Sequence, residues 1–192
     1  YTSSANLYSA FIERCIELSE EDGYTAMVTP DTFKYQYSYR GLRKDLASSS
    51  QIIDAVHLAR YGFSNQKDRY VIPFVLQNQD PDQFDKSRFY RLTHEQEEYK
   101  DYNLKVSGLE RVTKKLRQKG DHKDVYVVDQ KDFLKIEKTP FVYYLGQDIL
   151  TFLTTEEQLS QNAELKTWLD TQGNDDKFIR RWWEVAPESG NN

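Results

Sequence analysis

The sequence is poor in the residues that build several common kinds of site. Its one cysteine, Cys15, excludes a disulfide framework and a cysteine-based zinc site. No two of its 8 glycines are closer than 12 residues, so no glycine-rich turn lets the backbone approach a phosphate or a dinucleotide. Its 5 prolines are likewise isolated from one another. These absences exclude nucleotide sites of the Walker and dinucleotide-fingerprint types.

Long hydrophobic runs are missing as well. No apolar stretch approaches the roughly 18 residues that a membrane-spanning helix needs. The sequence does not open with a basic and then apolar leader either. We therefore expect no membrane span and no export, and we predict a cytoplasmic protein.

What is present indicates a folded, mildly acidic domain. The 192 residues are 38% hydrophobic and 14% aromatic, and they carry a formal net charge of −5. This aromatic content excludes a disordered acidic tail. The length suits one domain, or one domain and part of another, with a sizeable core.

The first 78 residues alternate between helix and strand patterns. A helix is predicted over 6–18, with Leu7, Phe11, Cys15 and Leu18 on its apolar face. The remaining predicted elements here are a helix over 39–47 and strands over 24–29, 51–58 and 70–77. Two successive strands without an intervening helix predict an α/β fold whose sheet has an antiparallel finish. Pro73 weakens the third strand, because proline removes a ladder hydrogen bond.

Composition changes after residue 78, which we take as a domain boundary between 1–78 and 79–192. Residues 79–87 form a polar connector, and 92–119 are charged with a mostly helical pattern. A short strand is predicted over 124–128, within an otherwise mixed, largely helical C-terminal extension.

The nucleophilic and metal-binding side chains form no recognisable catalytic or metal site. Cys15 is expected to be a buried structural thiol, and His57 a packed imidazole within a strand. A Cys15–His57 pair has no third residue to orient it. His94 and His122 lie in charged segments without metal-ligand spacing. We therefore predict no catalytic and no metal-binding residue in this chain.

Two basic segments could contact nucleic acid. The cluster within 111–119 is flanked by acidic residues, and we interpret it as a solvated helix face. In the segment 168–185, Arg180 and Arg181 lie between aromatic residues, an arrangement that suits stacking and phosphate contact. Alternatively the tryptophans there are core residues, and the arginines pair with neighbouring carboxylates. The residues alone favour neither interpretation.

The order of several motifs resembles a known family. N-L-Y-S-A-F-I-E-R-C-I-E-L, then D-G-Y-T-A-M-V-T-P, then I-I-D-A-V-H-L resemble the second half of an adenine-specific N6 DNA methyltransferase. D-Q-K-D-F-L-K-I-E-K-T-P-F-V-Y-Y-L and T-Q-G-N-D-D-K-F-I-R-R-W-W-E-V are similar to the large methyltransferase of the BREX and phage-growth-limitation defence systems. The last motif is the most specific of these.

The resemblance implies a fold and a set of roles. The chain would hold the last three strands of a class I methyltransferase (Rossmann-like) sheet, with the seventh strand antiparallel between the fifth and the sixth. Phe63 would stack on the flipped adenine, with Tyr61 as the alternative, because an extruded base needs an aromatic face. Lys177, Arg180 and Arg181 would contact the DNA backbone. The full-length enzyme would use S-adenosylmethionine.

Departures from the family pattern matter as much as the matches. The family transfers a methyl group with an Asn/Asp-Pro-Pro-Tyr/Phe motif, and this chain has neither a Pro-Pro pair nor the cofactor's glycine-rich turn. It therefore resembles a fragment that is inactive alone and binds no cofactor. Without a fourth strand, 24–29 would be an open edge, which we expect another copy or the C-terminal segment to cover. The alternative function is a non-enzymatic α/β module that binds nucleic acid or protein.

Overall fold

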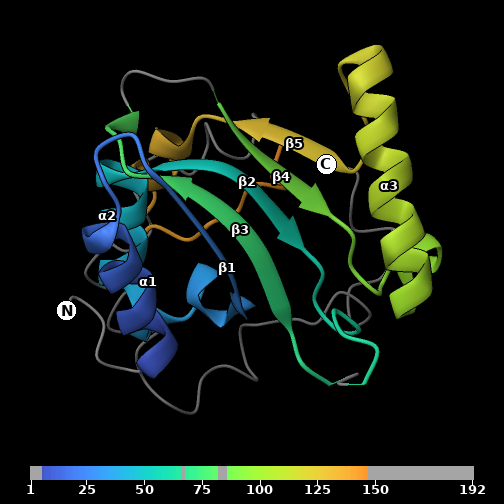
Figure 1. The fold of residues 1–192 in the computed structure, drawn as a ribbon, viewed down its shortest axis with the longest axis horizontal. Helices are drawn as coiled ribbons and strands as arrows, with labels where there is room; N and C mark the ends of the chain where they lie inside the picture. The colour runs from blue at the N-terminus through green and yellow to red at the C-terminus, as the bar shows by residue number, and fades with distance from the viewer. Residues whose placement is uncertain (1–5, 66–67, 82–85, 147–192) are drawn as a thin grey trace, which may run out of the picture. The chain divides into compact units, whose positions relative to one another are not determined.

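The computed structural model describes residues 6–65, 68–81 and 86–146, which lie in one compact unit ending at Gly146 (Figure 1). The predicted DNA-contact residues Lys177, Arg180 and Arg181 lie outside the described residues. The α-helices are α1 (Leu7–Leu18), α2 (Arg40–Ser49) and α3 (Tyr102–Lys119). The strands are β1 (Tyr24–Pro30), β2 (Gln51–His57), β3 (Val71–Gln77), β4 (Ser87–Arg91) and β5 (Val125–Val128). Short 3-10 helices are η1 (Asp31–Lys34), η2 (Tyr37–Tyr39), η4 (Glu97–Tyr99) and η5 (Gln130–Lys135).

The strands form one mixed sheet in the order β1-β3-β2-β4-β5. β3 lies between β1 and β2 and is antiparallel to both, which confirms the predicted antiparallel finish. β4 is parallel to β2, and β5 is antiparallel to β4. The sheet therefore continues beyond the three predicted strands into the segment that follows residue 78.

The segment between β3 and α3 differs most from the prediction. β4 was not predicted, because its five residues, S-R-F-Y-R, are too short for their alternation to stand out beside a polar connector. The helical pattern predicted from residue 92 becomes a helix only at Tyr102, after η4. The carboxylate of Asp101 accepts a hydrogen bond from the Leu104 amide and so caps α3 at its start. Gly120, with φ of 80°, ends the helix.

Pro73 is accommodated inside β3. It pairs with Val28 of β1, but the ladder between β2 and β3 has a register shift and its last pair is Ala55 with Phe74. Pro73 therefore lies just past the paired part of β2, where its missing amide hydrogen breaks no ladder position on that side.

Two apolar cores cover opposite faces of the sheet. Ile12, Leu42 and Leu46 of α1 and α2 pack with Phe89 and with Phe133 of η5 in the larger core. Val112 of α3 packs with Tyr90, Leu92 and Tyr99 in the smaller one. Phe89 and Tyr90 are consecutive in β4 and so point to opposite faces. Figure 1 accordingly shows α1 and α2 together at one side of the sheet and α3 at the other.

The predicted apolar face of α1 is wrong. The side chains of Leu7, Phe11 and Leu18 are 71%, 53% and 68% exposed, whereas Ile12 is fully buried. The face that packs on the core is instead centred on Ile12, with Tyr8 and Ile16 beside it. The 3.6-residue period is satisfied by both faces, so periodicity alone cannot say which one meets the sheet.

β1 forms an edge of the sheet. Within the described residues it pairs only with β3, so its other side presents an unpaired ladder, as predicted. Beside it, Ala26 and Val28 of β1 and Pro73 and Val75 of β3 line a shallow hollow of about 300 Å³. The described residues leave this hollow uncovered. None of the described helices combines the length and apolarity that a bilayer crossing requires.

The segment from η5 to residue 143, which we call the strap, is fastened to α2 by buried polar side chains. The guanidinium of Arg43, fully buried, donates to the carbonyls of Phe33, Gln36, Lys138 and Thr139 at 2.6–2.9 Å. The Gln130 amide donates to the carbonyls of Leu46, Ala47 and Ser50 at the end of α2. Its oxygen accepts from the Ile52 amide at 2.8 Å. These bonds fix the strap against the start of β2.

Candidate functional site

The carboxyl ends of three strands meet at one edge of the sheet. β2 and β4 are parallel, and β1 and β2 are both antiparallel to β3, so β1, β2 and β4 point the same way. η1 follows β1, the loop 58–70 follows β2, and residues 92–94 follow β4. Because α/β folds bind ligands outside the carboxyl ends of their strands, this carboxyl edge is the candidate site.

The loop 58–70 has an unusual backbone. Ala59 and Tyr61 have φ of 52° and 60°, the left-handed region that residues with a Cβ rarely adopt. At Gly62 a Cβ atom would lie 2.1 Å from Cγ2 of Val71, so only glycine fits there. Strained residues of this kind cost about 1–3 kcal/mol each and cluster at functional sites. Residues 59–62 of the loop are therefore held in one specific backbone conformation.

The two aromatic residues predicted to stack on a base differ in their surroundings. The side chain of Phe63 is 40% exposed on the loop between β2 and β3. Tyr61 is half-buried, and its ring meets the ring of His94 edge-on with centroids 6.1 Å apart. Phe63 is thus available to a ligand, whereas Tyr61 is already packed against the protein.

His94 lies at the centre of a small cluster that sequence analysis did not find. Its ring also meets the ring of Tyr70 edge-on, at 6.0 Å, and the Arg60 guanidinium lies 5.4 Å from the centroid of that ring. We call Arg60, Tyr61, Tyr70 and His94 the edge cluster. Arg60 and His94 are far apart in sequence and come together only because β4 pairs with β2. Because β4 was not predicted from the sequence, this cluster could not be predicted either.

Lys105 of α3 fixes the base of the edge cluster. Its side chain is buried, and its ammonium donates to the carbonyls of Leu58 and Leu92, which flank the loop and the segment after β4. Burial lowers the pKa of Lys105 to about 8. Lys105 therefore links the loop and the segment after β4 through one side chain.

A second group of polar side chains at the same edge is hydrogen-bonded within the protein. The Tyr143 hydroxyl donates to Nδ1 of His57 at 2.7 Å, and Nε2 of His57 donates to Oδ2 of Asp31 at 3.0 Å. Burial lowers the pKa of His57, which keeps the ring neutral, and burial raises the pKa of the Tyr143 phenol. Burial also acts to raise the pKa of Asp31, but the bond from His57 and the charge of Lys34 outweigh it.

This Tyr143–His57–Asp31 chain resembles a nucleophilic triad only in outline. Tyr143 is 1% exposed and Asp31 is 2% exposed, so no substrate can reach either oxygen. The Lys34 ammonium lies 3.5 Å from Oδ2 of Asp31 and balances its charge. The chain therefore anchors the strap to the ends of β1 and β2, and His57 is the packed imidazole that the sequence predicted.

Metal-ligating side chains and the close contacts of the glycines are the remaining features of the described residues that could indicate a bound group. Within the described ranges, no three His, Cys, Asp or Glu side chains gather as metal ligands would. The glycines that make close approaches do so to the chain itself: Gly62 faces Val71, and Gly108 faces the Tyr99 ring. These two close approaches are packing contacts within the chain.

Comparisons with known proteins agree with the resemblance inferred from the sequence. Residues 1–63 match the family of Eco57I restriction-modification methylases. The chain is 28% identical over 190 residues to the adenine-specific methyltransferase BrxX of Escherichia coli O9:H4 (strain HS), covering 97% of this chain and 14% of BrxX. It is also 28% identical over 185 residues to the adenine-specific methyltransferase PglX of Lacticaseibacillus casei (strain Zhang), covering 95% of this chain and 15% of PglX. The chain thus spans about one seventh of the length of these relatives.

A solved structure of the type I R-M system, described as showing complex assembly and conformational transition, has a similar fold. It aligns with a TM-score of 0.52 over 93% of this chain and 41% of that chain, at 11% identity. At this identity the similarity concerns the fold alone. The resemblance to adenine-specific methyltransferases of restriction and phage-defence systems is therefore confirmed, and so is the mixed α/β fold class.

Proposed function

We propose that this chain is part of a DNA adenine-N6 methyltransferase of a restriction or BREX-type phage-defence system that uses S-adenosylmethionine. The observation that carries the proposal is the similarity to two adenine-specific methyltransferases along nearly the whole chain. The position of β3, antiparallel between β1 and β2, agrees with the end of a class I methyltransferase sheet. In the full-length protein the chain supplies this end of the catalytic sheet.

Phe63 is the residue we propose to stack on the extruded adenine. It lies on the loop at the carboxyl edge, and 40% of its side chain is exposed. An extruded base loses its stacking partners, and an aromatic side chain can replace them. Tyr61 is the alternative, but using it would disrupt its contact with His94.

DNA is the proposed partner of the full-length enzyme. Lys177, Arg180 and Arg181 are proposed to contact its backbone, because cations between aromatic residues suit both phosphate contact and stacking. Self-association through the unpaired side of β1, or cover of that side by the C-terminal segment, also stays a proposal. The uncovered apolar hollow beside β1 supports a packed partner there.

Alone, the chain is proposed to bind no cofactor and to transfer no methyl group. The support is chemical: the sequence has no Pro-Pro pair to orient the adenine amine and no glycine-rich turn. Calorimetric titration of the isolated chain with S-adenosylmethionine should give no heat of binding. Clear micromolar binding would contradict this part of the proposal and leave the rest intact.

The function is tested by replacing Phe63 with alanine in the full-length protein. Stacking of one base is worth about 1–3 kcal/mol, so Phe63→Ala should lower kcat/KM for adenine methylation about 5- to 150-fold. Phe63→Trp should retain most of the activity, because indole also presents a flat face. Fluorescence of 2-aminopurine at the target position reports the extruded base directly and should fall in Phe63→Ala.

Two controls separate this role from simple damage. Thermal unfolding of Phe63→Ala should match that of the wild type, because an exposed side chain contributes little to stability. Tyr61→Ala should lower activity less than Phe63→Ala. The opposite order would transfer the stacking role to Tyr61, and the absence of any adenine methylation by the wild type would refute the function itself.

A further inference from the structure

The edge cluster contains buried polar atoms without partners. In the part of the chain that the structure describes, five buried side-chain nitrogen or oxygen atoms lack a hydrogen bond. Three of them, Nε of Arg60, Oγ1 of Thr93 and Nδ1 of His94, belong to two segments that meet at the carboxyl edge. An unsatisfied buried polar group costs about 1–3 kcal/mol, so a group of three calls for an explanation.

The surrounding contacts hold these atoms in place rather than letting them turn to water. The rings of Tyr61 and Tyr70 meet His94 from two directions, and the Tyr70 ring also lies beside the Arg60 guanidinium. Lys105 bonds Leu58 and Leu92, which precede Arg60 and His94 by two residues each. The aromatic contacts therefore hold the Arg60 guanidinium and the His94 imidazole, both of which are half-buried, in fixed positions at the carboxyl edge, which lowers the entropic cost of binding a ligand there.

The chemistry of the cluster suits an anion with several acceptor oxygens. Arg60 offers a planar fork of donors and has no carboxylate partner among the described residues. The half-buried His94 ring adds a further potential donor, whereas the Thr93 hydroxyl belongs to a residue only 2% exposed and is out of a ligand's reach. The nearest carboxylate of η1, Asp31, is already bonded to His57 and balanced by Lys34. A phosphate diester matches this set of groups better than a neutral ligand does.

The position of the cluster on the loop indicates which phosphate. Arg60 precedes Phe63 by three residues, so their Cα atoms lie within about 11 Å of each other. When a nucleotide turns out of the duplex, its flanking phosphates come to the protein surface beside the pocket. We propose that Arg60 and His94 bind a backbone phosphate next to the extruded adenine, while Tyr61 and Tyr70 position the two side chains. This inference rests on the proposed function and deepens it.

The test measures DNA binding by the full-length methyltransferase as a function of salt. The probe is a fluorescent duplex that contains the adenine methylated by the wild type. Its affinity for the protein is measured at salt concentrations from about 50 to 200 mM. One lost phosphate contact lowers the slope of log K against log salt by about 0.9. Arg60→Gln should show this loss, equally on target and unrelated duplexes. Arg60→Lys should largely keep the wild-type slope.

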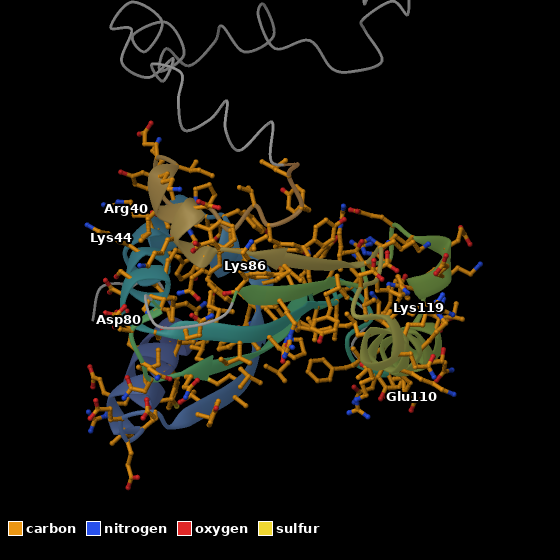
Figure 2. The ribbon with its side chains drawn as sticks, turned by 90° about the horizontal axis from the view of Figure 1, so that it is seen from above. Arg40, Lys44, Asp80, Lys86, Glu110 and Lys119 are labelled. Atoms are coloured by element: carbon orange, nitrogen blue, oxygen red, sulfur yellow. The ribbon has the colours of Figure 1, made fainter. Side chains whose placement is uncertain are left out.

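Matched variants separate charge from structure. Lys86→Gln removes one charge immediately before β4, at the edge where β2 and β4 begin, and should leave the slope unchanged (Figure 2). His94→Phe keeps a ring against Tyr61 and Tyr70 but removes both ring nitrogens, so it should weaken binding without lowering the temperature of thermal unfolding. A slope in Arg60→Gln equal to that of the wild type would overturn the proposal.

A chemical change in the DNA tests the same contact from the side of the phosphate. Methylphosphonate in place of a phosphate beside the target adenine removes its charge, and it should weaken wild-type binding at one of the flanking positions. At that position Arg60→Gln should lose no further affinity. If the wild type methylates adenine but ignores every flanking methylphosphonate, the phosphate site is wrong and the function stands. If the wild type neither binds nor methylates DNA, the proposed function fails instead.

Discussion

The strap and the loop 58–70 are both strained, but only one of them satisfies its polar groups. Lys138 and Thr139 in the strap have φ of 66° and 53°, close to the values of Ala59 and Tyr61 in the loop. The carbonyls of Lys138 and Thr139 are both bonded by Arg43, and no unpartnered buried atom comes from the described part of the strap. The loop borders three such atoms.

This difference separates two uses of strain. In the strap, strained residues turn their carbonyls toward a buried cation, and the hydrogen bonds offset the strain within the folded chain. In the loop, the strain holds an exposed aromatic ring beside donors that nothing in the described chain satisfies. A strained segment with complete hydrogen bonding indicates a structural joint, and one with incomplete bonding indicates a place where a ligand binds.

The largest effect is expected where the strap is fastened. Arg43→Ala leaves four carbonyls without their donor, and bonds to charged groups are worth about 1.5–3 kcal/mol each, partly recovered by water. We expect the free energy of unfolding to fall by about 3–5 kcal/mol in a urea titration. Arg40→Ala, on the same helix and exposed, should change it by less than about 0.5 kcal/mol (Figure 2). Equal losses in the two variants would contradict the role of the strap.

A smaller loss of stability is expected for a substitution in the loop, because it changes a packing contact and no hydrogen bond. Gly62→Ala places a Cβ 2.1 Å from Cγ2 of Val71, a stiff β-branched side chain, and should destabilise the fold by about 1–3 kcal/mol. Combining it with Val71→Ala should cost less than the sum of the single changes, because the clash disappears. Gly146→Ala meets no atom within 4 Å and should be nearly neutral. Additive losses in the double variant would show that the contact with Val71 is not the cause.

The smallest expected effect is the change in the free energy of unfolding with pH that Lys105 causes. Its pKa is about 8 in the folded chain against an ordinary value of 10.5, so above pH 8 the unfolded chain binds more protons. The free energy of unfolding should therefore rise between pH 8 and 9.5, by at most about 1.4 kcal/mol per pH unit for this group. Lys34, whose pKa burial also lowers to about 8, adds to the rise. Urea titrations across this range should show a shallower rise in Lys105→Met than in the wild type.

The control for this measurement is Lys44→Met, which removes an exposed lysine from α2 (Figure 2). It should keep the wild-type dependence on pH. The range stops at pH 9.5 because Tyr99 and other buried tyrosines, whose pKa values are raised by burial, oppose the trend at higher pH. A Lys105→Met curve parallel to the wild type would show that Lys105 does not titrate as proposed.

Much of the fold could be predicted from local pattern. α1, α2, β1, β2, β3 and β5 all lie within a residue or two of the predicted ranges, because their apolar periods are regular and turn residues bound them. β4 was not predicted because Phe89 and Tyr90 are adjacent aromatic residues that pack on opposite faces of the sheet. Its five residues therefore show no alternation of apolar and polar side chains. The face of α1 escaped because both sides of the helix carry apolar residues.

The candidate site was only half visible in the sequence. Phe63 was singled out through the family resemblance, which implies a base-stacking aromatic residue on the loop between these two strands, and Phe63 lies on that loop in the structure. Arg60 and His94 could not be brought together from the sequence, because their shared contact with the Tyr70 ring depends on β4 lying parallel to β2. The base-stacking and DNA-contact roles remain predictions, and those of Lys177, Arg180 and Arg181 concern residues outside the described part.

The hydrogen bonds of Arg43 also determine when the core can close during synthesis of the chain. Its Nε partner, the Thr139 carbonyl, lies 96 residues later in the chain. At about 5–20 residues per second, a ribosome needs roughly 5–20 s to make that stretch. During this interval the Arg43 guanidinium lacks two of its four carbonyl acceptors, those of Lys138 and Thr139. The nascent sheet should therefore stay loosely packed and accessible to chaperones until the strap emerges, and docking of the strap should be a late folding event.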